Sequence, residues 1–273
     1  MATRSDSPRT SKLHWIDFAG RHFLPALSHW CTRAHIKWPL RLKPRAVEWT
    51  KAALINRISR NRGYRSYLEI CTATTGNRYS EIDRSILRDS YRLMYWKPDG
   101  HSDLNTIDFA TTGFDTTECI REIRARQLRF DIILVDAWHE YDTAVRDLGD
   151  ALSLLQPRGT LVVHDCLPPS EALASPIYRA GEWCGVTYKA YLDFVIARPE
   201  LEYRTVDIDF GCGVIRSRPA LARSPAGDEY NALLGQWKAV GDDLGAAYRF
   251  MLEHQRPLCR VQSIEDFIRD EEG

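Results

Sequence analysis

Residues 130–170 decide the fold of this chain, and they read FDIILVDAWHEYDTAVRDLGDALSLLQPRGTLVVHDCLPPS. Two short, β-branched apolar runs, Phe130–Val135 and Thr160–Val163, are typical of strands buried on both faces of a parallel sheet. Between them, apolar residues from Tyr141 to Leu155 recur at three- and four-residue spacing. This spacing predicts a helix with one apolar stripe on the sheet, ended by Pro157 and Gly159.

Two acidic residues follow the two predicted strands of this stretch. A strand–helix–strand unit of this length crosses over right-handed, so Asp136 and Asp165 are expected at the carboxyl ends of neighbouring parallel strands. Open α/β sheets bind their ligands at that edge. The sequence therefore predicts that the two carboxylates meet at one ligand-binding edge.

The rest of the chain also alternates strands with helices, which predicts an α/β fold. The predicted arrangement is a Rossmann-like, doubly wound, mostly parallel sheet with an antiparallel edge. The further predicted strands are Tyr67–Cys71, Arg92–Trp96, Thr106–Ala110 and the antiparallel pair Tyr203–Asp207 and Gly213–Arg216. The further predicted helices are Val47–Ile58, Tyr79–Leu87, Thr117–Arg126, Val186–Ala197, Asp228–His254 and Ser263–Asp270.

Changes of composition along the chain predict four segments. These are a disordered N-terminus at 1–12, a helical N-terminal region at 13–62, the α/β domain at 63–217 and a helical C-terminal tail at 218–273.

Composition limits the classes of function. With 273 residues, of which 44% are hydrophobic, the chain can bury one large core. Its 37 basic and 37 acidic residues balance, so we expect neither nucleic acid nor an anionic membrane surface as a partner. The apolar runs are too short for a membrane span, the N-terminus lacks a signal peptide's apolar core, and the seven cysteines form no C-x-x-C pair. These features predict a cytoplasmic protein. They do not exclude that it forms a homo-oligomer.

Five segments occur in an order that points to a known family. They are YLEI at 67–70, DAWHEYDTAVRDL at 136–148, GTLVVHDCLPP at 159–169, the segment around Trp183, and DIDFGCGVIR at 207–216. Together they resemble the class I S-adenosylmethionine-dependent methyltransferases. More narrowly, they are similar to the bacterial small-molecule O-methyltransferase branch that includes macrocin-type enzymes. The tail at 251–268 is also similar to tails of that branch.

The resemblance implies a set of cofactor-binding residues, and here the chain departs from the family pattern. Glu69 matches the acid of the first strand, but Cys, Ala and Thr precede Gly76 where the family has alternating glycines. Lys97 stands where an acid would bind the ribose hydroxyls, so Asp99 is the expected substitute. The resemblance places Asp115 and Thr116 near adenine and counts Asp136 among the cofactor contacts. An ordinary helix cap is the alternative for Asp115 and Thr116.

Acids and histidines after the fourth and fifth strands suggest two kinds of chemistry. In one interpretation Asp136, Asp165 and His164 hold a divalent cation, expected to be Mg²⁺, which lowers the pKa of an acceptor hydroxyl. In the other, His139, with Asp136, acts as the general base. The structural alternatives are that Asp136 caps the following helix, that His139 hydrogen-bonds backbone, and that His164 only supports its neighbours.

The function predicted from these residues is methyl transfer from S-adenosylmethionine to a hydroxyl of a small-molecule acceptor, a sugar or a secondary metabolite. Two other classes stay open. One is a methyltransferase-fold protein that has lost its methyl donor and serves as a scaffold or partner. The other is a metal-dependent hydrolase or lyase that uses the same acids and histidines.

Overall fold

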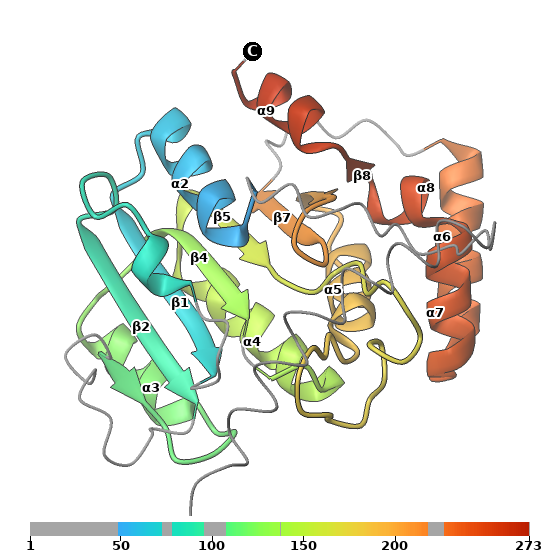
Figure 1. The fold of residues 1–273 in the computed structure, drawn as a ribbon, viewed down its shortest axis with the longest axis horizontal. Coiled ribbons are helices and arrows are strands. Elements are labelled where there is room, and N and C mark those ends of the chain that lie inside the picture. Colours follow the sequence, from blue (N-terminus) through green and yellow to red (C-terminus); the bar gives the residue numbers. More distant parts are fainter. Residues whose placement is uncertain (1–48, 73–77, 96–107, 137, 218–226, 273) are drawn as a thin grey trace, which may run out of the picture. The chain divides into compact units, whose positions relative to one another are not determined.

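Eight strands form a single sheet in the order β3-β2-β1-β4-β5-β7-β6-β8 (Figure 1). The computed structural model describes residues 49–72, 78–95, 108–136, 138–217 and 227–272, which belong to one compact unit within Lys43–Gly273. The predicted N-terminus at 1–12 and most of the predicted helical region at 13–62 lie outside the described residues.

Strands β1 to β5 are parallel, and β7 runs antiparallel to both of its neighbours. The predicted mostly parallel sheet with an antiparallel edge is therefore confirmed. A short strand that the sequence did not predict, β8, adds to β6 in parallel. The strands are β1 Ser66–Thr72, β2 Asp89–Tyr95, β3 Phe109–Ala110, β4 Phe130–Asp136, β5 Leu155–Val163, β6 Leu201–Val206, β7 Cys212–Ser217 and β8 Val261–Gln262.

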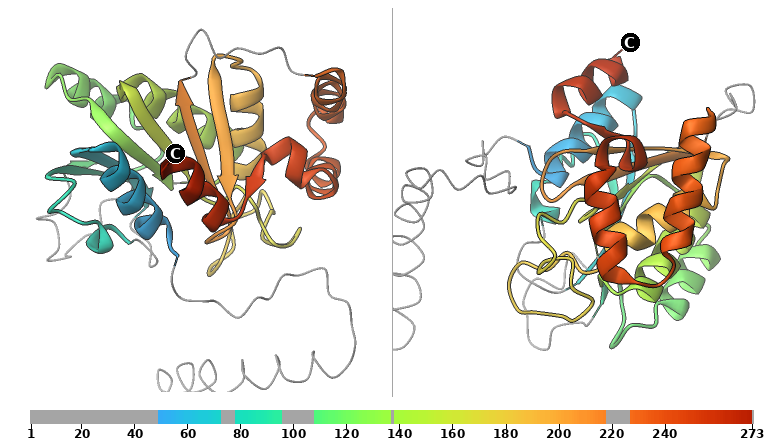
Figure 2. Two further views of the ribbon diagram at one scale, coloured as in Figure 1. Left: turned by 90° about the horizontal axis from the view of Figure 1, so that it is seen from above. Right: turned by 90° about the vertical axis from the view of Figure 1, so that its right-hand side faces the viewer.

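Helices cover both faces of the sheet (Figure 2). The described helices are α2 Lys51–Arg62, α3 Thr117–Ala125, α4 Tyr141–Leu154, α5 Thr187–Ile196, α6 Asp228–Val240, α7 Leu244–Glu253, α8 Gln255–Cys259 and α9 Ile264–Glu272. Helices α2 and α9 pack on one face, and α3 to α8 pack on the other. Strand β4 serves both cores because its side chains alternate: Ile132 and Leu134 face α2, whereas Ile133 and Val135 face α4.

Helix α2 begins later than its apolar pattern suggested. The hydroxyl of Thr50 accepts a hydrogen bond from the Ala53 amide at 3.2 Å and caps the helix, which ends at Gly63 with φ of 69°. This cap makes Lys51 the first residue of α2, whereas the predicted start at Val47 lies outside the described residues. The N-terminus of α2 therefore lies at a fixed place, which matters for the site below.

The predicted helix Tyr79–Leu87 was wrong. Only one 3₁₀ turn, Tyr79–Glu81, forms there. The Asp83 carboxylate accepts hydrogen bonds from the Ser85 amide and hydroxyl, while Asn56 accepts one from the Asp83 amide. Such local side-chain hydrogen bonds compete with helix formation.

Two other helices end at residues different from those predicted. Helix α4 ends at Leu154 and β5 begins directly at Leu155, so the Pro157 and Gly159 region belongs to the strand. The predicted helix Asp228–His254 is broken into α6 and α7, because Gly241 takes a positive φ of 61° and Asp243 caps the next helix. None of the helices in the described part of the chain combines the length and apolar character that crossing a membrane requires.

A buried hydrogen bond ties the end of β2 to α4. The Tyr95 hydroxyl donates to the Asp147 carboxylate at 2.6 Å, and Arg146 lies 3.3 Å from the same oxygen. Burial raises the pKa of Asp147 to about 6, although Tyr95 and Arg146 oppose the shift. Asp147 is therefore a desolvated charge at neutral pH.

We expect Asp147→Asn to flatten the pH dependence of stability between about pH 4 and 6. The folded protein keeps the Asp147 proton up to about pH 6, whereas the unfolded chain releases it near pH 3.9. The free energy of unfolding therefore falls as pH rises through this interval, by up to about 3 kcal/mol. Urea titrations across the interval measure it, with the exposed Asp142→Asn as control. Equal slopes for wild type and Asp147→Asn would contradict the assignment.

Candidate active site

Two neighbouring strand ends bring the acidic residues of the site together. In the parallel pair of β4 and β5, Val135 lies opposite Val163, so Asp136 and Asp165 follow at the same edge of the sheet. Asp165 adopts a left-handed conformation with φ of 60°, which Asp tolerates better than most side chains. The predicted meeting of the two carboxylates at one edge is therefore observed.

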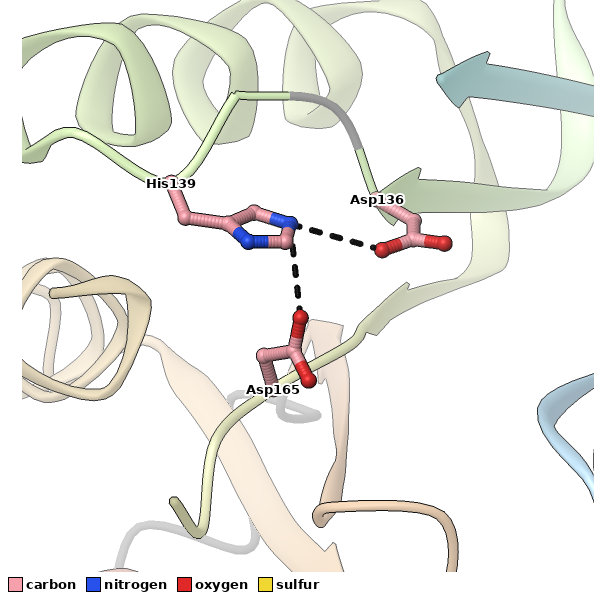
Figure 3. A group of neighbouring side chains, drawn as sticks. All are labelled: Asp136, His139 and Asp165. Atoms are coloured by element: carbon pink, nitrogen blue, oxygen red, sulfur yellow. Dashed lines mark ion pairs between the residues drawn. The ribbon is translucent and has the colours of Figure 1, made fainter. Parts of the chain in front are cut away.

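His139 lies between the two carboxylates (Figure 3). Its Nε2 is 3.3 Å from Asp165 Oδ2 and 3.5 Å from Asp136 Oδ1, within ion-pair distance but without hydrogen-bond geometry. Its Nδ1 lies 2.7 Å from the carbonyl oxygen of Trp183, so Nδ1 carries a proton and donates it. Nε2 is consequently the ring nitrogen available for chemistry.

A glycine holds His139 in this position. Gly185 has a φ of 56°, and a Cβ there would overlap the backbone carbonyl and the Cβ of His139. The next residue, Val186, donates its amide to the His139 carbonyl at 2.8 Å. The segment before α5 therefore fixes both the backbone and the ring of His139.

His164 lies near the same two carboxylate oxygens as His139. Its Nδ1 is 3.1 Å from Asp136 Oδ1 and 3.3 Å from Asp165 Oδ2. Its Nε2 is 3.6 Å from Asp209 Oδ2, in the turn between β6 and β7. The predicted metal-binding set of Asp136, Asp165 and His164 therefore stays a prediction, and Asp136, His139 and Asp165 form a second set whose donor atoms lie within 4.8 Å of one another.

The sequence did not point to two further charged members of the site. Lys51, the first residue of α2, places Nζ 2.5 Å from Asp136 Oδ2. Its backbone amide donates to Asp209 Oδ2 at 3.2 Å. The turn containing Asp209 was recognised as a turn, but no local signal joins it, or a lysine 85 residues before Asp136, to this edge of the sheet.

The charges of the site shift one another's pKa values. Burial would raise the pKa of Asp136, but Lys51 and His164 outweigh it and hold the value well below its usual range. Burial would lower the pKa of His139, yet Asp165 and Asp136 raise it. Burial also opposes ionisation of Asp209, whose pKa nevertheless falls to about 2 because of His164 and Lys51. The site therefore favours ionised Asp136 and Asp209 at neutral pH.

The structure distinguishes among the purely structural roles considered for Asp136, His139 and Asp115. Asp136 does not cap α4, because the cap residue is Glu140 and the Asp136 oxygens contact Lys51 and His164. His139 does hydrogen-bond backbone, through Nδ1 alone. Asp115 is exposed and accepts a hydrogen bond from the Thr117 amide at 2.9 Å, as a helix-start residue does.

Two of the remaining predicted cofactor residues, Thr116 and Glu69, lie among the described residues. Thr116 is buried at the start of α3. Glu69 lies inside β1, 2% exposed, and accepts a hydrogen bond from the Tyr67 hydroxyl at 2.7 Å. Burial raises the pKa of Glu69. Gly76 and Asp99 lie outside the described residues, so the predicted cofactor roles stay predictions.

A cluster of aromatic rings lies beside His139. Trp138 lies 5.0 to 5.2 Å, between ring centres, from Phe114, Tyr178 and Trp183. The Trp183 ring is in turn 5.3 Å from the His139 ring. Two members are open to solvent, Phe114 by 40% and Tyr178 by 50%. We call these four residues the aromatic wall.

The Asp136, His139 and Asp165 group has the chemistry of a cation site. Two carboxylate oxygens and Nε2 of His139, a buried atom without a hydrogen-bond partner among the described residues, lie within 4.8 Å of one another. These residues fit a divalent cation. An imidazole donor suits Mn²⁺ or Zn²⁺ better than the expected Mg²⁺, which prefers oxygen ligands.

Comparison with protein families assigns the chain. A model of a family described as a methyltransferase domain matches residues 30–166, half of the chain. The chain belongs to this methyltransferase family. The match includes β1, β4, β5 and the acids and histidines at their carboxyl ends, and it confirms the predicted methyltransferase resemblance. A comparison with curated proteins found no match.

Several solved structures are similar to this methyltransferase. A putative caffeoyl-CoA O-methyltransferase from Staphylococcus aureus is 16% identical, with 75% of this chain and 97% of that chain covered and a TM-score of 0.45. An O-methyltransferase from Bacillus cereus in complex with SAH is 15% identical, with coverages of 74% and 96% and a TM-score of 0.45. The MycE methyltransferase of mycinamycin biosynthesis, in complex with Mg, SAH and mycinamycin VI, is 14% identical, with coverages of 80% and 66% and a TM-score of 0.42.

We expect Gly185→Ala to displace His139, because the added Cβ would overlap it and the positive φ disfavours any side chain. The expected loss of stability is at least about 1 kcal/mol, measured by urea unfolding. The imidazole NMR signal of His139 should also shift. The control is Gly149→Ala inside α4, where an added Cβ meets nothing within 4 Å; it should stabilise by about 0.5–1 kcal/mol. An unchanged His139 signal in Gly185→Ala would contradict the positioning role.

Proposed function

We propose that this methyltransferase transfers a methyl group from S-adenosylmethionine to a hydroxyl of a small molecule at the Asp136, His139 and Asp165 group. One observation carries the proposal: a buried imidazole nitrogen, which has no hydrogen-bond partner among the described residues, faces two carboxylates at the ligand-binding edge of a methyltransferase-family sheet. Such a nitrogen can take the proton that an acceptor hydroxyl must lose as it attacks the methyl group.

His139 can fill one of its two candidate roles at a time. Because Nδ1 is committed to the Trp183 carbonyl, Nε2 must either accept the proton or bind a cation. We favour the general base as its role in catalysis. A divalent ion held by Asp136, His139 and Asp165 would instead lower the pKa of the acceptor hydroxyl.

In the favoured mechanism each residue has a defined task. His139 receives the acceptor proton on Nε2, and the raised pKa of His139 makes its neutral form a stronger base. Asp165 and Asp136 stabilise the imidazolium that results, through the contacts at 3.3 and 3.5 Å. The Trp183 carbonyl keeps the ring in the required tautomer.

The aromatic wall suggests how the acceptor is held. Phe114 and Tyr178 present ring surface to solvent next to Trp138 and Trp183. An acceptor whose hydroxyl reaches His139 can therefore place an aromatic or sugar ring against them. We propose that the wall binds the ring that carries or adjoins the reacting hydroxyl.

His139→Gln should lower methyl transfer by about 100-fold or more, because it removes the general base. The affinity for S-adenosylhomocysteine should stay within about threefold, because the base does not hold the methyl donor. The first measurement screens methyl-labelled donor against phenolic and sugar acceptors, and the second is isothermal titration. His254→Gln, at the end of α7, is the matched control and should leave both unchanged. Full activity in His139→Gln would exclude it as the base.

The same titration separates the proposal from the scaffold alternative. No heat with wild type at millimolar S-adenosylhomocysteine would refute the methyl-donor half of the proposal and favour a protein that has lost its cofactor.

Tyr178→Ala should raise the KM for the acceptor about three- to tenfold while kcat stays near the wild-type value, because a stacked ring contributes binding rather than proton transfer. Tyr178→Phe keeps the ring and should restore the KM. An equal rise in both variants would assign the effect to the hydroxyl, and no rise in either would show that the acceptor binds elsewhere.

A further inference from the structure

Lys51 brings a permanent positive charge into the site. Its side chain is 8% exposed, and its Nζ lies 2.5 Å from Asp136 Oδ2. Among the residues that the structure describes, it is the one lysine or arginine whose side chain pairs with a carboxylate of this group. An ammonium ion is buried only where a partner charge offsets its lost hydration.

The pairing leaves Asp136 with one oxygen for the rest of the site. Oδ2 is held by Lys51, so Oδ1 faces the His139 and His164 rings at 3.5 and 3.1 Å. A divalent cation bound to Asp136, His139 and Asp165 would therefore share the Asp136 carboxylate with an ammonium. Two cations on one carboxylate repel each other.

Helix α2 fixes the backbone position from which the Lys51 side chain reaches Asp136. Lys51 is the first residue of α2, its backbone amide donates to Asp209 at 3.2 Å, and Thr50 caps the helix. The buried residues Ala52, Leu54 and Ile55 follow at once and anchor the helix on the sheet. The backbone of Lys51 is therefore anchored, and from this position its buried side chain reaches Asp136.

We propose that Lys51 is the resident cation of this site: a positioning residue that holds Asp136 with Oδ1 toward His139 and weakens the binding of divalent cations. The inference rests on the location of the proposed active site. It deepens the proposed function, because a carboxylate already paired with an ammonium leaves catalysis to the His139 base.

The proposal is tested by titrating the full-length chain with Mn²⁺ alone. Binding is measured as the loss of the EPR signal of free Mn²⁺. Wild type should bind Mn²⁺ weakly. Lys51→Met should bind it at least about tenfold more tightly, because the repelling charge is gone. Lys51→Arg keeps a positive charge and should bind as weakly as wild type.

A matched control comes from another buried lysine. Lys189 pairs with Asp193 at 2.7 Å and its side chain is also 8% exposed, but it lies in α5 and contacts none of the three donor residues. Lys189→Met should lose stability without gaining Mn²⁺ affinity. If Lys51→Met does not fold, Lys51→Gln provides a neutral replacement that can hydrogen-bond Asp136.

The possible results are distinct. Equal Mn²⁺ affinities in wild type, Lys51→Met and Lys51→Gln would overturn the proposal and leave Lys51 as an anchor of α2. Binding by none of the proteins would overturn it as well, because the group would then not hold a cation. Titration of the same samples with S-adenosylhomocysteine separates these results from failure of the proposed function, since that binding does not depend on Mn²⁺.

Discussion

The parallel pairing of β4 with β5 is the constraint on which the rest of the site depends. Its register sets Val135 against Val163, so Asp136, one residue after the first, and Asp165, two residues after the second, bring their carboxylates together. Carboxylates this close repel unless cations lie among them. The sheet register brings the two carboxylates together. The histidines and Lys51, which come from the surrounding elements, provide the positive charges that offset the repulsion between them.

The charged groups around the two carboxylates come from different parts of the chain. His139 lies before α4, and its ring is oriented by the carbonyl of Trp183, which is 44 residues away in sequence. Lys51 arrives at the start of α2, and Asp209 joins from the turn between β6 and β7. Because the group is buried and mutually paired, a change in one member alters the charge state of the others. The site is best understood as one coupled unit.

The coupling among these charges affects how the acceptor hydroxyl can lose its proton during methyl transfer. A divalent ion and a general base are alternative ways to remove a hydroxyl proton. This chain contains the donor atoms that could bind a divalent ion. It also contains Lys51, whose positive charge opposes the binding of such an ion. The family assignment gives the reaction class, whereas the position of Lys51 bears on whether a divalent ion or a general base removes the proton.

The sequence by itself determined the strand–helix–strand unit, the mostly parallel sheet and the meeting of Asp136 with Asp165, because local periodicity and crossover handedness suffice for these. Local patterns failed at Tyr79–Leu87, where side-chain hydrogen bonds replaced a helix. Only the tertiary structure decided that Nε2 is the available nitrogen of His139, through the contact with Trp183, and that Lys51 and Asp209 belong to the site. The physical reason is that these contacts join residues far apart in sequence, which short-range spacing does not encode.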